Sequence, residues 1–259
     1  MALKAIIFDV DGTIAETADV KRAAFNQAFA EIGLDWVWNR AVFARILADA
    51  LPGSEVEFHA ILHRPQDYDW LEANGQLSRL PVRARQIYRD LLESGAAPLR
   101  PGVARLMGEI IAARVPLALC STGPREEFET LLYNRFGHEM LDALACSVAT
   151  EDLNSHAPLK AYRTCLQRLG LPAHDVLAID DNPRSVAAAA SLGLCVIATP
   201  GSYGRNAAFA GACRVLSDLG QPSAPFRCLA GDAGGHSHVT LALLEQWHRQ
   251  ARLQRASAA

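Results

Sequence analysis

Residues 3–13 read LKAIIFDVDGT, and this stretch decides the fold. Its first part, Leu3 to Phe8, is largely apolar without alternation, which is typical of a strand buried in a parallel sheet. Asp9 and Asp11 follow at the carboxyl end of this strand. Because side chains alternate along a strand, both carboxylates point to the same side, and Val10 faces the other way. The stretch therefore predicts a buried strand that ends in two acidic side chains.

A second apolar strand, residues 177–179, also ends in paired aspartates, Asp180 and Asp181. Carboxyl ends of parallel strands meet at one edge of a sheet, so four carboxylates are expected to converge there and to repel one another. Oxygen ligands without His or Cys favour Mg²⁺. The sequence thus predicts a magnesium site formed by Asp9, Asp11, Asp180 and Asp181. The alternative, in which each pair only caps a turn or a helix, suits an isolated D-x-D better than two equivalent strand ends.

Between these strands, residues 117–120 form a third apolar run that ends in Ser121 and Thr122, with Pro124 where a helix begins. Hydroxyl groups and free backbone N–H groups ahead of a helix N-terminus bind anions. An ordinary helix cap explains the same pattern. The shared sheet edge favours an anion site.

The order of elements predicts the architecture. After Pro101-Gly102, helical and strand patterns alternate up to a strand at residues 194–198, which predicts an α/β fold with a Rossmann-like parallel sheet and helices on both faces. Residues 17–95 show helical spacing and no strand-like run. We therefore expect a core domain of residues 1–16 and 96–259, with an inserted α-helical cap domain of residues 17–95.

Composition excludes several classes of protein. The chain has 259 residues, half of them hydrophobic, and a formal net charge of −3 without a long basic run, so nucleic acid is not an expected partner. No apolar run is long enough for a membrane span, and the N-terminus lacks a signal-peptide pattern. The six cysteines form no C-x-x-C pair, which indicates reduced thiols and a cytoplasmic protein. The oligomeric state stays open, with a monomer favoured.

The motifs above resemble those of a known family. The DVDGT motif of residues 9–13, Ser121 after a strand, a basic residue before or in a later helix, and Asp180-Asp181 resemble the four motifs of the haloacid dehalogenase superfamily of phosphohydrolases. Further segments resemble its CbbY-like subgroup, helical-cap sugar-phosphate phosphatases related to β-phosphoglucomutase. These segments are residues 15–17 (AET), 25–26 (FN), 33–36 (GLDW), 88–94, 98–106 (PLRPGVARL) and 243–248.

The resemblance implies roles for individual residues. Asp9 is implied to attack phosphorus and form an aspartyl-phosphate, and Asp11 to act as general acid and then as general base. Mg²⁺ is implied to bind Asp9, the backbone carbonyl of Asp11, Asp181 and Asp180. Ser121 and the N–H of Thr122 are implied to hold phosphate oxygens.

The third motif departs from the family pattern. The family supplies a lysine there, and aligning Tyr162 with the family's aromatic residue places His156 at that position. Lys160 lies four residues later, about one helical turn away. We expect Lys160 to supply the missing cation, with His156 as the alternative.

The cap segment departs as well. Relatives carry a histidine where this chain has Lys21, four residues after Thr17, and we name both residues as candidates for contact with the substrate. The glycine-basic loop of the bisphosphate-specific relatives is not recognisable, and the corresponding residues 48–57 are acidic. This difference weakens the case for xylulose-1,5-bisphosphate as substrate.

Three functions remain. The leading one is a Mg²⁺-dependent phosphatase that acts on a small phosphorylated metabolite such as a sugar phosphate. A phosphomutase of the β-phosphoglucomutase type is the second, and Lys21 in place of histidine argues against it. The third is a catalytically weak metabolite-binding protein, against which the intact pair of Asp9 and Asp11 argues.

Overall fold

The computed structural model describes residues 2–51, 53–153, 157–204 and 207–258. The chain divides into two compact units, one made of residues 1–16 and 98–259 and the other of residues 17–97. The first unit is an α/β unit and the second is helical.

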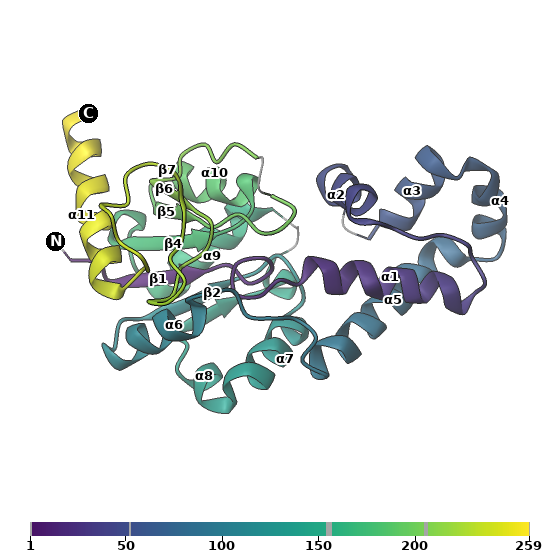
Figure 1. The fold of residues 1–259 in the computed structure, drawn as a ribbon, viewed down its shortest axis with the longest axis horizontal. Helices are drawn as coiled ribbons and strands as arrows, with labels where there is room; N and C mark the ends of the chain where they lie inside the picture. The colour runs from purple at the N-terminus through teal and green to yellow at the C-terminus, as the bar shows by residue number, and fades with distance from the viewer. Residues whose placement is uncertain (1, 52, 154–156, 205–206, 259) are drawn as a thin grey trace. The chain divides into compact units, whose positions relative to one another are not determined.

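The α/β unit is built on a sheet that has seven strands in the described residues, in the order β3-β2-β1-β4-β5-β6-β7 (Figure 1). The strands are β1 (Ala5–Phe8), β2 (Leu117–Cys120), β3 (Cys146–Val148), β4 (Val176–Asp180), β5 (Cys195–Ala198), β6 (Arg214–Leu216) and β7 (Cys228–Ala230). Strands β1 to β6 pair in parallel, and β7 pairs antiparallel with β6. The predicted α/β class with a mostly parallel, Rossmann-like sheet is confirmed.

Strand β1 lies between β2 and β4, and all three strands end next to residues predicted to form the site. Phe8 is in register with Leu119 of β2 and with Ile179 of β4, and every side chain of β1 is buried. The loops that follow these three strands therefore leave the sheet side by side, with the two pairs of aspartates on adjacent strands.

Helices cover both faces of this sheet (Figure 1). Helices α9 (Pro158–Leu169) and α10 (Pro183–Ser191) share an apolar core with Ile7 and Ala178. Because side chains alternate along β1, Ile6 and Phe8 face the other side, where α6 (Val103–Ala112) packs against β2 and against α11 (Leu241–Ala258). The remaining helical elements of this unit are α7 (Arg125–Phe136), α8 (His138–Asp142) and the 3₁₀ turns η1 (Thr150–Asp152) and η2 (Ala173–Asp175).

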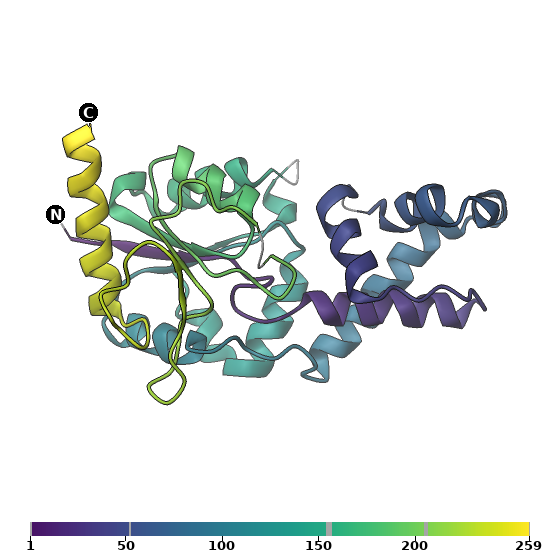
Figure 2. The same cartoon turned by 45° about the horizontal axis from the view of Figure 1, so that its top comes forward.

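Two strands were not expected from the sequence. The last strand expected was that of residues 194–198, yet β6 and β7 extend the sheet beyond it. Each has only three residues, so neither gives an apolar run long enough to predict a strand. Figure 2 shows α11 beside the start of β1, where Lys4 and Arg252 both bind the carboxylate of Asp175.

The helical unit consists of five helices in its described residues: α1 (Ala18–Glu31), α2 (Arg40–Asp49), α3 (Glu55–His63), α4 (Pro65–Ala73) and α5 (Gln76–Glu93). Its core is aromatic, since Phe29 and Phe43 pack around the buried Trp38. Trp36 is also buried, whereas Trp70 is 47% exposed.

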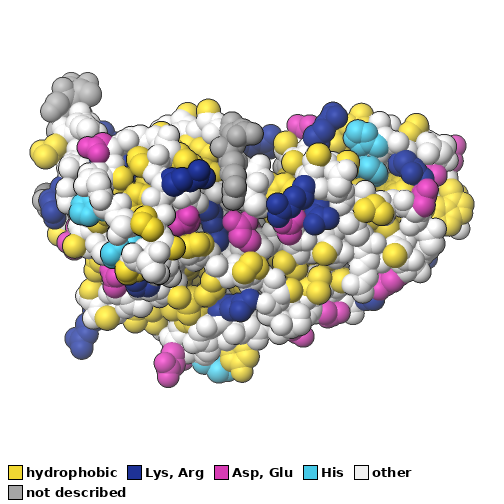
Figure 3. Space-filling view, viewed as in Figure 1, with side chains coloured by type: hydrophobic (Ala, Val, Ile, Leu, Met, Phe, Trp, Pro, Cys, Tyr) yellow, Lys and Arg dark blue, Asp and Glu magenta, His cyan; other side chains and the backbone are white. Residues whose placement is uncertain are grey.

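The surface carries mixed charges. On the face drawn in Figure 3, Lys and Arg side chains are interspersed with Asp and Glu, without a broad basic patch over the described residues. Among the helices of the described ranges, none combines the length and apolarity needed to cross a bilayer.

Candidate active site

Three carboxylates meet where β1 and β4 end. The backbone N–H of Asp9 donates to the carbonyl of Ile179 at 2.9 Å, which places Asp9 next to Asp180. Asp9, Asp180 and Asp181 each offer an oxygen atom, and these atoms lie within 4.8 Å of one another. Asp180 is buried and the other two are half-buried. Hard oxygen ligands this close together suit a divalent cation.

The negative charges of these carboxylates repel one another. Burial raises the pKa of Asp9 well above its usual value, and the neighbouring charges of Asp180, Asp181 and Asp11 raise it further. Burial also raises the pKa of Asp180 to about 7. The pKa of Asp181 is raised by burial and by the charge of Asp180, while the charge of Arg100 opposes the rise. Keeping all three ionised is costly without a bound cation.

Side-chain donors orient two of the carboxylates. The hydroxyl of Thr13 donates to Oδ2 of Asp9 at 2.9 Å. The hydroxyl of the buried Tyr162, on α9, donates to Oδ2 of Asp180 at 2.6 Å. The backbone N–H of Asn182 donates to Oδ1 of the same carboxylate at 2.7 Å. Both oxygens of Asp180 therefore accept hydrogen bonds from fixed protein groups.

Two glycines leave room for Asp181. Gly12 has a φ of +82°, and a Cβ there would lie 2.0 Å from Oδ2 of Asp181. A Cβ at Gly201, in the loop after β5, would lie 2.8 Å from the same oxygen. A side chain at either position would displace this carboxylate, and the positive φ of Gly12 further favours glycine there.

Arg100 ties together the segments around Asp181. This arginine is 6% exposed, and its guanidinium pairs with Glu16 at 3.3 Å. It also donates to four backbone carbonyls, those of Gly12, Thr199, Pro200 and Ser217. The loop after β1 and the loop after β5 are thus held by one buried cation. The sequence did not single out Arg100 for this role, because its acceptors are backbone atoms that no sequence pattern marks.

Asp11 and Ser121 both lie close to Gly123. From the Cβ position of Gly123, Oγ of Ser121 is 3.3 Å away and Oδ2 of Asp11 is 3.5 Å away. Ser121 is buried at the end of β2, and its hydroxyl accepts a 2.9 Å hydrogen bond from the backbone N–H of Gly123. The structure therefore brings the predicted acid/base residue close to the predicted phosphate-binding loop.

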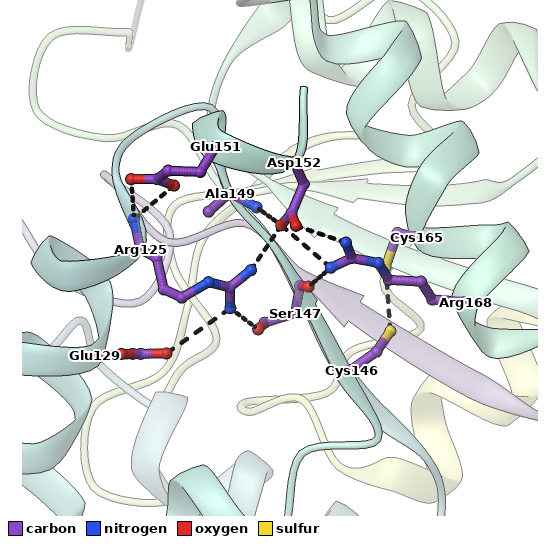
Figure 4. A network of polar contacts seen from close by, with 9 residues as sticks. All are labelled: Arg125, Glu129, Cys146, Ser147, Ala149, Glu151, Asp152, Cys165 and Arg168. Carbon is purple, nitrogen blue, oxygen red and sulfur yellow. Dashed lines mark hydrogen bonds and ion pairs between the residues drawn. The ribbon is translucent and has the colours of Figure 1, made fainter. Parts of the chain in front are cut away.

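A network of polar contacts holds η1, the 3₁₀ turn next to the Ser121–Gly123 loop (Figure 4). The carboxylate of Asp152, in η1, accepts from Arg125 at the start of α7 and from Arg168 near the end of α9, both at 2.6 Å. The backbone N–H of Thr150 donates to the carbonyl of Gly123 at 2.9 Å, and its hydroxyl donates to the carbonyl of Thr122. Thr122 itself is exposed.

The structure describes one of the two candidates for the third-motif cation. His156 lies outside the described residues. Lys160 is exposed in the first turn of α9, and Tyr162, two residues on, is buried against Asp180. Residues two apart on a helix are about 200° apart around its axis, so Lys160 leaves the helix on a different side from Tyr162. Its role as a cation stays a prediction.

The two cap candidates belong to the helical unit. Thr17 is buried, and its carbonyl accepts from the backbone N–H of Lys21 at 2.9 Å. The ammonium group of Lys21 lies 5.1 Å from the centre of the Tyr88 ring, in a cation–π contact that joins α1 and α5. Their role in contacting substrate also stays a prediction.

Comparison with known proteins identifies the family. A family model described as haloacid dehalogenase-like hydrolase matches residues 3–193. The chain belongs to the haloacid dehalogenase-like hydrolases. It is 34% identical over 248 residues to the plasmid-encoded protein CbbY of Cupriavidus necator, covering 95% of this chain and 97% of that protein. It is also 28% identical to a phosphoglycolate phosphatase of Rhodospirillum rubrum, covering 83% of this chain and 88% of that protein. This member of the family is a hydrolase of the phosphatase type.

Solved structures of the family agree with the fold. CbbY from Rhodobacter sphaeroides in complex with phosphate matches with a TM-score of 0.72 and 30% identity, over 84% of this chain and 95% of that chain. A complex of the same protein with xylulose-(1,5)bisphosphate gives a TM-score of 0.72 at 29% identity, over 86% and 98% of the two chains. β-Phosphoglucomutase from Clostridium difficile, with a TM-score of 0.66 at 12% identity over 97% and 99%, shares the fold.

Proposed function

We propose that this hydrolase is a Mg²⁺-dependent phosphatase that releases phosphate from a small phosphorylated metabolite, a sugar phosphate, through an aspartyl-phosphate on Asp9. The observation that carries the proposal is the cluster of Asp9, Asp180 and Asp181, whose oxygens lie within 4.8 Å of one another. Asp11 lies beside the Ser121–Gly123 loop at the same edge of the sheet.

The donor set fits a magnesium ion. All donors are oxygens, and burial together with the negative charges of the neighbouring carboxylates raises the pKa values of Asp9 and Asp181. Asp9, Asp181 and the backbone carbonyl of Asp11 would hold the ion directly, and Asp180 through water, since its oxygens already accept hydrogen bonds. The bound ion would supply neutralising charge to the carboxylates and the phosphate.

The two aspartates after β1 would carry out the chemistry. A carboxylate oxygen of Asp9 attacks phosphorus, and the bond from phosphorus to the leaving oxygen breaks while Asp11 donates a proton to that oxygen. Asp11 then takes a proton from water as the water oxygen attacks the aspartyl-phosphate, which restores Asp9 and yields inorganic phosphate. The hydrogen bond from Thr13 holds Asp9 in a fixed orientation for this attack.

Ser121 and the N–H of Thr122 would bind the phosphate oxygens, with Lys160 or His156 as the additional cation. The helical unit would select the substrate through residues such as Thr17 and Lys21. Relatives named CbbY include one solved with xylulose-(1,5)bisphosphate, which supports a sugar phosphate as the substrate class. A cytoplasmic location and a monomeric state remain part of the proposal.

The test measures phosphate release from p-nitrophenyl phosphate and from a panel of sugar phosphates, with Mg²⁺ and with excess EDTA. We expect turnover only with Mg²⁺, and a loss of roughly 10³-fold or more for Asp9→Asn, as for other essential nucleophiles. Circular dichroism of the variant checks that the fold is intact. Full activity in EDTA, or a near-wild-type rate for the variant, would refute the proposal.

The same assay separates the two other functions. A phosphomutase would convert one sugar phosphate into an isomer without releasing phosphate. A metabolite-binding protein would turn over none of these substrates, although ligands would still raise its melting temperature.

A further inference from the structure

Two thiols lie together on the side of the sheet that α11 covers. Cys195 is the first residue of β5, and Cys213 comes directly before β6. The backbone N–H of Cys213 donates to the carbonyl of Val196 at 2.8 Å, so strand pairing holds the two cysteines next to each other. The thiol of Cys195 donates to Sγ of Cys213, and the two sulfur atoms are 3.4 Å apart.

The two thiols differ in environment. Cys195 is 2% exposed, whereas Cys213 is half-buried. The hydrogen bond from Cys195, the backbone of Val196 and the charges of Arg255 and Arg214 lower the pKa of Cys213 to about 6, against the effect of burial. Arg255 is held in place by hydrogen bonds to the carbonyls of residues 193 and 194, beside Cys195. The half-buried thiol of Cys213, whose pKa is lowered, therefore faces the buried thiol of Cys195.

One other pair of cysteines has a similar arrangement. Cys146 and Cys165 face each other at 3.9 Å beside Arg168, and the hydrogen bond from Cys165 lowers the pKa of Cys146 (Figure 4). Cys120 is buried, and burial together with the charge of Asp9 raises its pKa well above the usual value. Cys228 is exposed, and its thiol donates to backbone carbonyls of β7 and the turn after it. The pair of Cys195 and Cys213 thus has the shorter sulfur–sulfur distance, 3.4 Å against 3.9 Å.

We propose that Cys213 and Cys195 are a thiol–disulfide exchange site that takes a small-molecule disulfide, such as oxidised glutathione, and ends as an intramolecular disulfide. The proposal is independent of the phosphatase function.

The exchange has two balanced steps. The thiolate of Cys213 attacks one sulfur of the small disulfide, which forms a mixed disulfide and releases one small thiolate. The sulfur of Cys195 then attacks the sulfur of Cys213 and loses its proton, which releases the second small thiolate. Two protein thiols are oxidised, and the small disulfide is reduced to two thiols.

The new bond would close the chain between residues 195 and 213. This segment contains Thr199 and Pro200, whose carbonyls bind Arg100, and Gly201, which lies against Asp181. Closing a loop of this length restricts the unfolded chain, so we expect the melting temperature to rise by roughly 5–10 °C.

The experiment incubates the full-length protein with oxidised glutathione at neutral pH and follows intact mass and peptide maps. We expect the loss of two hydrogen atoms in mass and a peptide linked through Cys195 and Cys213. Cys195→Ala should stop at a glutathione adduct on Cys213, and Cys213→Ser should give neither product at this pair. Cys228→Ser, as a matched control, should still form the bridge.

Three results would overturn the proposal: all thiols stay free, the wild-type protein keeps a stable glutathione adduct at Cys213, or the only bridge formed links Cys146 to Cys165. Thermal unfolding of the variants before oxidation checks that they are folded. The reduced and oxidised proteins are compared in the same measurement for the expected shift in melting temperature.

Discussion

The hydroxyl of Tyr162 donates a 2.6 Å hydrogen bond to Oδ2 of Asp180, and both side chains are about 1% exposed. The tyrosine comes from α9 and the aspartate from the end of β4, so the bond links a helix that covers the sheet to the acidic cluster. The buried carboxylate of Asp180 also accepts a hydrogen bond from the backbone N–H of Asn182, so two fixed donors set its orientation.

Tyr162→Phe removes this hydroxyl and keeps the ring. We expect the fold to persist, with a stability loss of about 1.5–3 kcal/mol, because a buried charged acceptor loses its donor. Since outer hydrogen bonds orient metal ligands, the Mg²⁺ affinity should fall roughly 10-fold. The affinity is measured from the rise in melting temperature with Mg²⁺. Tyr133→Phe, at a tyrosine 48% exposed, is the matched control and should leave both quantities unchanged.

Arg100→Lys and Arg100→Met test the residue that holds the loops around Asp181. Both variants leave buried carbonyls without donors, and we expect the methionine variant to lose about 3–5 kcal/mol of stability. The lysine variant keeps the charge and should stay folded, with Mg²⁺ affinity reduced about 10–100-fold in thermal-shift titrations.

The control for Arg100 is Arg105→Lys. Arg105 also combines an ion pair, with Glu109, and hydrogen bonds to the carbonyls of Leu219 and Gly220, and none of these partners lies in the loops after β1 and β5. We expect it to lower stability without changing Mg²⁺ affinity. An equal loss of affinity in the Arg105 and Arg100 variants would show that the effect is a general destabilisation.

Lys160→Met and His156→Ala identify the third-motif cation. If the ammonium group of Lys160 stabilises the transition state, its removal should cost at least ~100-fold in kcat, by analogy with other strong electrostatic donors. Steady-state rates of p-nitrophenyl phosphate hydrolysis provide the measurement. A nearly active Lys160 variant beside an inactive His156 variant, in an enzyme whose rate falls as the pH rises through the imidazole pKa, would assign the role to the histidine.

The lowered pKa of Asp175 predicts that the stability of the protein depends on pH. Hydrogen bonds from Lys4 and from Arg252 lower its pKa from the ordinary value of 3.8. A carboxyl group whose pKa is lower in the folded state stabilises the fold above its unfolded pKa, and this contribution is lost as the pH falls through the folded pKa. We expect Asp175→Asn to be less stable than the wild type at neutral pH, and the difference to shrink below about pH 4.

Urea unfolding at several pH values checks this expectation. Asp232→Asn, at an exposed aspartate, is the control and should follow the wild-type curve. A stability difference for Asp175→Asn that stays constant down to the acid transition would contradict the assignment.

The acidic edge could be predicted because its residues lie in continuous motifs. Asp9 and Asp180 each follow an apolar strand, and parallel strands bring such ends together. Arg100 could not be predicted, since its acceptors at Thr199 and Ser217 are backbone carbonyls from segments about a hundred residues away. Helical spacing predicts that Lys160 reaches back to the site, and this stays a prediction; the position of α9 that is buried against Asp180 belongs to Tyr162.

The order of strands has a consequence for how the chain is made. Strand β1 leaves the ribosome first, yet its neighbours in the sheet are β2 and β4, whose residues are synthesised more than a hundred residues later. The helical unit is continuous in sequence, so it can fold while β1 is still an unpaired apolar segment. Until β4 has been synthesised, the strand that precedes Asp9 therefore has at most one partner, and assembly of the acidic cluster waits for the emergence of β4.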